Sequence, residues 1–130
     1  MSPIIERLQK IEADVSADRG SFCLFALFLP EDALGKWDIV VAAPWIEKEP
    51  TEAVRYLSGL LQDAFSREEI VVFSRIAIVP CAAEEIDRLD NLHRVEHGLK
   101  EIPNQTLFGI RIATAYVITA MRHESDQVYK

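Results

Sequence analysis

The stretch "FCLFALFLP", residues 22–30, is the longest apolar run of the chain and the feature that most limits its fold. Its nine residues are about half of what a helix needs to cross a membrane. A short, unbroken apolar run that ends at a proline is typical of a buried strand. The run therefore predicts a globular protein built on a sheet, in agreement with 49% hydrophobic and 27% charged residues.

The segments on either side of this run alternate between helical and strand patterns. "WDIVVAAPW" is β-branched at its centre and should pair antiparallel with the first strand. In "EEIVVFSRIAIVP", Ser74 and Arg75 interrupt the apolar pattern, which is typical of a bulge or of a strand that leaves its cover. The expected elements are a helix over 3–18, strands over 21–30 and 37–45, a helix over 47–65, a strand over 68–80, a helix over 82–98 and a strand over 106–121.

This order predicts a single α+β domain over residues 1–121, followed by a polar tail over 122–130. The domain should contain a mixed four-stranded sheet and about three helices in the order α-β-β-α-β-α-β. The long strands over 70–79 and 106–121 offer more sheet surface and edge than three helices readily cover. A second copy of the chain could cover the remainder, so we expect a homo-oligomer or another protein partner.

The charge balance narrows the choice of partner. Fourteen Lys and Arg residues against twenty-one Asp and Glu residues give a net charge of −7. Such a chain repels phosphate backbones and anionic membrane surfaces, so we expect neither nucleic acid nor a membrane as partner. Cys23 and Cys81 stand 58 positions apart, each in or beside an apolar run, and we expect free buried thiols in the cytoplasm.

One short motif could hold a metal. In "HRVEH", His93, Glu96 and His97 have the H-x-x-E-H order, which resembles the motif of inverted zinc peptidases. The resemblance covers five residues and implies two histidine ligands to zinc, with Glu96 as general base. Against it, Gly98 should end the helix directly after His97, which places the two histidines on a fraying last turn.

Two other groups of residues are candidates for a site. Cys81 follows a strand and opens a helix, where the helix dipole can lower the pKa of a thiol and make it a nucleophile. Trp37, Asp38 and Trp45 lie on or beside the second strand and could line a cleft or anchor a subunit contact. Ordinary core packing explains both tryptophans equally well.

These observations favour a small, acidic, cytoplasmic binding or oligomeric interaction module without catalytic activity or cofactor. The alternatives are a zinc-dependent hydrolase built on residues 93–97 and a thiol enzyme that uses Cys81. The sequence alone does not identify a small-molecule ligand.

Overall fold

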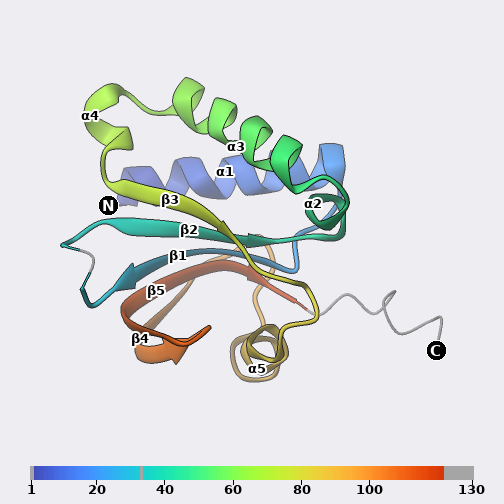
Figure 1. Cartoon of the computed structure of the whole chain (residues 1–130), viewed down its shortest axis with the longest axis vertical. Coiled ribbons are helices and arrows are strands. Elements are labelled where there is room, and N and C mark those ends of the chain that lie inside the picture. The colour runs from blue at the N-terminus through green and yellow to red at the C-terminus, as the bar shows by residue number, and fades with distance from the viewer. Residues whose placement is uncertain (1, 33, 122–130) are drawn as a thin grey trace.

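Over residues 2–32 and 34–121, which the computed structural model describes, five strands form one mixed sheet (Figure 1). The strands are β1 (Leu24–Pro30), β2 (Trp37–Ala42), β3 (Phe73–Ile78), β4 (Lys100–Leu107) and β5 (Ile110–Ala120). Their order across the sheet is β3-β2-β1-β5-β4, and β2 and β3 run parallel while the other neighbours run antiparallel. The apolar run that predicted a buried strand therefore lies at the centre of the sheet.

Helices cover both faces of this sheet. On one face lie α1 (Ser2–Arg19) and α3 (Pro50–Ala64), and on the other lies α5 (Glu84–His93) (Figure 1). The first face packs Leu8 and Leu57 against strand residues such as Phe25 and Val41, and the second packs Ile86 and Leu89 against residues such as Leu24 and Val117. Two apolar layers thus bury β1 from both sides, as its continuous apolar sequence requires.

The predicted α+β class and the antiparallel pairing of the first two strands are confirmed, but the number of elements is wrong. The sheet has five strands instead of four, and the described chain has five helices instead of three. The predicted tail over 122–130 lies outside the described residues. Within the described chain, no helix combines the length and apolarity needed to cross a membrane.

The predicted single strand over 106–121 is two strands joined by a tight turn. Leu107 pairs with Ile110, and Phe108 and Gly109 between them have φ angles of 54° and 76°. Positive φ at both central residues is the geometry of a two-residue hairpin turn that matches the twist of its strands. Asparagine or aspartate usually fills the first of these positions, so Phe108 concealed the turn in the sequence.

The predicted helix over 82–98 ends earlier, at His93. The chain beyond it joins the sheet, because Ala120 donates its N–H to the carbonyl of Val95 and Gly98 donates to Ile118. These bonds to β5 replace the helical hydrogen bonds that the sequence pattern had suggested. His93 and His97 are therefore not on one helix.

Two short helices account for the remaining differences. Pro44 begins α2 (Pro44–Lys48), where we expected the end of a strand. Ser66 caps α4 (Arg67–Ile70), and its hydroxyl and the Glu69 carboxylate exchange hydrogen bonds with each other's backbone N–H. This capping box makes a helical turn out of residues that we had assigned to the start of a strand.

Candidate functional site

Strand β3 is an edge of the sheet and pairs with β2 on one side. The N–H of Val79 donates to the carbonyl of Val41, so Val79 directs its backbone groups toward β2. Successive residues of a strand direct their backbone groups to opposite sides. Ala77 therefore faces β2 as well, whereas Ile76 and Ile78 direct their N–H and C=O groups to the open side.

The side chains of this edge are mainly apolar. The strand reads "FSRIAI", with Arg75 as its single charged residue. Ile78 is 36% exposed, and Ile76 is half-buried against the core. Natural edge strands are usually protected by lysine, proline or inward-pointing charges, and β3 has little of this protection.

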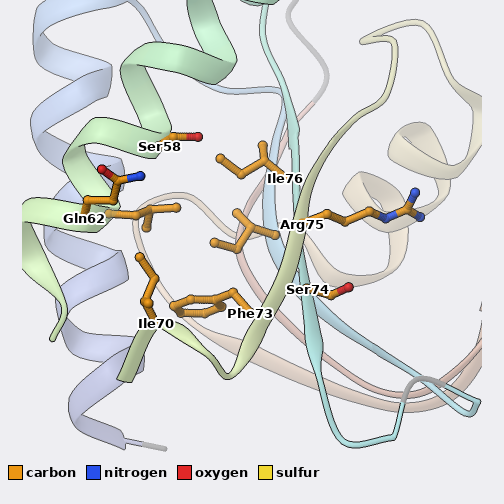
Figure 2. Close-up of a pocket in the computed structure, with 9 residues that line it drawn as sticks. Ser58, Gln62, Ile70, Phe73, Ser74, Arg75 and Ile76 are labelled. Atoms are coloured by element: carbon orange, nitrogen blue, oxygen red, sulfur yellow. The ribbon is translucent and has the colours of Figure 1, made fainter. Parts of the chain in front are cut away.

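A recess of about 170 Å³ adjoins β3 on the face that α1 and α3 cover. Ile70, Phe73 and Ile76 form its apolar part, and Ser58 and Gln62 on α3 add polar groups. Figure 2 shows these side chains directed into the space between α3 and β3, while Ser74 and Arg75 lie on the other side of the strand. A side chain that projects from a strand added beside β3 could enter this recess.

The predicted bulge in β3 is confirmed. Trp37 pairs with Phe73 and Asp38 pairs with Arg75, which leaves Ser74 as an extra residue. The bulge turns Arg75 to the face opposite Phe73 and Ile76. Its guanidinium Nε there lies 3.4 Å from the Asp38 carboxylate.

The opposite edge of the sheet, β4, has a different character. Its sequence "KEIPNQTL" includes the charged Lys100 and Glu101, and Pro103, which has no N–H to donate. Asn104 has a φ of 50°, which interrupts the extended backbone. Charges, proline and a local irregularity are the devices that keep an edge strand from pairing with another molecule.

The structure does not bring Trp37, Asp38 and Trp45 together in one site. The Trp37 ring lies 5.4 Å from the ring of Tyr116, on the face that α1 covers. Trp45 lies on α2, 5.9 Å from the ring of Phe22. The structure thus favours core packing for both tryptophans, and Asp38 points to the opposite face.

The structure divides the H-x-x-E-H residues between the end of α5, where His93 lies, and the segment that follows it. His97 has a φ of 53° and lies in the segment after α5, and its Nδ1 is 2.7 Å from Oε1 of Glu12. Among residues 2–32 and 34–121, no group of three or more His, Cys, Asp or Glu side chains is arranged to hold a metal ion. The zinc hydrolase therefore remains a prediction from the motif alone.

Glu12 is the centre of a polar network that we did not predict. Its side chain is fully buried on α1, and its Oε2 accepts hydrogen bonds from the hydroxyls of Thr119, at 2.7 Å, and Ser16, at 3.3 Å. The hydrogen bond from Glu12 favours the charged imidazole and raises the pKa of His97, although partial burial opposes this shift. The backbone N–H of His97 also donates to the Thr119 hydroxyl.

This network fixes the start of β4 to α1. Glu12 follows Leu8 by four residues and therefore lies on the buried stripe of the helix. A carboxylate on such a stripe needs buried donors, and this was the signal in the sequence that could have revealed the network.

The expectation of free thiols is wrong, because Cys23 and Cys81 form a disulfide with their Cα atoms 5.6 Å apart. In this form Cys81 has no thiol to act as a nucleophile. Its backbone N–H donates to the Glu47 carboxylate at 2.7 Å, so α2 also holds the segment after β3. A separation of 58 residues concealed the pair, since only strand pairing brings the two cysteines together.

No protein-family model, curated protein or solved structure matches this chain. The case for a function therefore depends on the geometry of the chain itself.

Proposed function

We propose that this protein is a non-catalytic interaction module that pairs strand β3 edge to edge with β3 of a second copy. The observation that carries the proposal is the difference between the two edges of the sheet. The β4 edge has charges, a proline and an irregular backbone, whereas β3 has one charged residue and a partly exposed isoleucine. An unprotected edge is a template for pairing with another strand.

The direction of the backbone groups supports a symmetric pair. Closed twofold dimers are the commonest oligomers, and an antiparallel pair of identical strands satisfies their symmetry. With the twofold axis near Ala77, Ile76 of one copy lies opposite Ile78 of the other. Both residues have outward backbone groups, so they can exchange the hydrogen bonds of an antiparallel ladder.

Burial of apolar side chains would add to these hydrogen bonds. Ile78 is partly exposed, and the recess beside Ile70, Phe73 and Ile76 can receive a side chain from the second strand. Apolar burial is the general source of association energy, at about 25 cal/mol per Å². The net charge of −7 also supports our proposal that neither nucleic acid nor an anionic membrane is the partner.

The test is the molar mass of the full chain in solution, measured by light scattering during size-exclusion chromatography. We expect a dimer at micromolar concentration and a monomer for Ile78→Lys, because the lysine places a charge in the pair interface. Leu92→Lys is the matched control, since Leu92 is 69% exposed on α5, and it should leave the dimer intact. A wild-type chain that stays monomeric at 100-fold higher concentration would overturn the proposal.

We also propose a cytoplasmic location, and the disulfide is the observation that weighs against it. Disulfides persist mainly in oxidising compartments. The test is to alkylate free thiols in living cells and to measure the fraction of Cys23 and Cys81 that is reduced. If the chain is cytoplasmic, both cysteines should be largely reduced.

A further inference from the structure

A second, larger recess lies on the face of the sheet opposite α1 and α3. It occupies about 390 Å³ between β3 and the hairpin of β4 and β5. Ligand pockets of proteins span roughly 300 to 1,000 Å³ and are mostly apolar with few polar groups. The walls of this recess have that composition, with Phe28, Val40, Ala77, Leu107, Phe108 and Ile112 among them.

One carboxylate points into this apolar recess. The Asp38 side chain is 9% exposed, and its polar contact within the described chain is the approach of Arg75 Nε at 3.4 Å. Charge-assisted hydrogen bonds between nitrogen and carboxylate oxygen are shorter, about 2.7 to 2.9 Å. A buried carboxylate needs close donors, and Asp38 has a distant one.

The Arg75 side chain can also move away from Asp38. Its side chain is 59% exposed at the rim of the recess, so it can move into water at little cost. A cation from outside could then take its place beside Asp38. An anionic ligand that paired with Arg75 would instead meet the buried Asp38 charge and a chain with a net charge of −7.

The aromatic lining suits the same kind of ligand. The rings of Phe28 and Phe108 are stacked with their centroids 6.2 Å apart. Aromatic faces attract cations and pack well against apolar groups. We propose that this recess binds a small organic cation, an amine or guanidine on an apolar or aromatic body, whose N–H groups pair with the Asp38 carboxylate.

Ile76 and Ile78 of the edge strand also line this recess, but Asp38 and the two aromatic rings come from other strands and from the hairpin turn. The test of this site therefore uses variants outside the proposed β3 pair contacts. The probe is phenethylamine, with the neutral 2-phenylethanol and the anionic 3-phenylpropionate as comparisons. Titration of the ¹⁵N-labelled full chain should give saturable shifts of the amide signals around Asp38, Ala77 and Phe108. We expect a millimolar Kd for the amine and at least tenfold weaker binding of both comparison compounds.

Two variants identify the group that binds the cation. Asp38→Asn, which keeps the shape of the side chain, should weaken phenethylamine binding at least tenfold. Arg75→Ala should strengthen phenethylamine binding several-fold, because it removes the cation that competes for Asp38. If the recess instead bound anionic ligands through Arg75, the same substitution would weaken their binding. Glu31→Gln is the control for an exposed carboxylate near the hairpin and should change nothing.

The proposal is overturned if phenethylamine gives no saturable shifts at concentrations about tenfold above a millimolar Kd. Equal binding of the alcohol, or unchanged amine binding by a folded Asp38→Asn variant, would also overturn it. The spectrum of each variant without ligand reports whether it is folded.

Discussion

The two edges of the sheet differ in both sequence and anchoring. The β3 edge is apolar, and its carboxyl end is held by the Cys23–Cys81 disulfide and by the hydrogen bond from Cys81 to Glu47. The β4 edge is polar, and its start is held by the network of Glu12, His97 and Thr119. A firmly held, apolar edge suits a docking surface, because little conformational entropy is lost on pairing.

The disulfide should give the largest effect on the β3 side. In the chain-entropy model, a crosslink between residues 58 positions apart stabilises the fold by about 4 kcal/mol. We expect reduction, or the double variant Cys23→Ala and Cys81→Ala, to lower the free energy of unfolding by an amount of this order. Urea unfolding with and without dithiothreitol measures it, and the double variant should no longer respond to dithiothreitol. Equal stability of oxidised and reduced wild type would contradict this prediction.

Proline substitutions test which way the backbone groups of β3 face. Ala77→Pro should remove a hydrogen bond to β2 and destabilise the fold by roughly 1 to 3 kcal/mol, since a buried carbonyl loses its donor. Ile78→Pro removes an N–H that faces outward. It should therefore lower the free energy of unfolding of the monomer less than Ala77→Pro does, but it should abolish the dimer. Urea unfolding and light scattering separate the two effects. The prediction is wrong if both variants lose the same stability.

The smallest expected effects concern the stability of the fold as a function of pH. The contribution near β3 and the contribution near β4 should change with pH in opposite directions. Near β3, Arg7 lies 2.7 Å from Glu69 and, with the backbone N–H of Ser66, lowers the pKa of Glu69 to about 2. Because the folded pKa lies below the ordinary 4.5, this stabilisation is present above pH 4.5 and is lost as the pH falls toward about 2. Near β4, the pKa of His97 is raised above 6.5, so its contribution is complete below pH 6.5 and is lost as the pH rises through the folded pKa.

Thermal unfolding between pH 2 and 9 gives stability as a function of pH. Its acid limb, below pH 4.5, tests Glu69, and its limb above pH 6.5 tests His97. Glu69→Gln should flatten the acid limb alone, and His97→Gln should flatten the limb above pH 6.5 alone. A single variant that altered both limbs would show that the two sides are not independent.

Much of the fold could be predicted because its patterns are local. The burial of strand β1, the amphipathic helices and the bulge at Ser74 each follow from the spacing of apolar residues over a few turns or strand positions. The predictions failed where contacts with distant parts of the chain, or an unusual residue in a turn, overrode the local sequence pattern. The last helix ended at His93 because residues 95–98 bond to β5, and Phe108 occupies a turn position that its type rarely fills.

The candidate sites were less predictable for the same reason. The sequence drew attention to Asp38 but grouped it with two tryptophans, whereas strand alternation sends it to the opposite face, beside Arg75. Glu12 was overlooked, although its place on a buried helix stripe was visible, because its two closest partners, His97 and Thr119, follow 85 and 107 positions later. Contacts of such long range are absent from any local pattern.

The sequence by itself determined the class of the protein: an acidic α+β chain with a sheet that contains one buried apolar strand, because apolar periodicity fixes which surfaces must be buried. Only the tertiary structure decided which strand became an open edge, which cysteines met and which face received Asp38. Those outcomes depend on strand order and register, and a register is set by contacts between residues far apart in the chain.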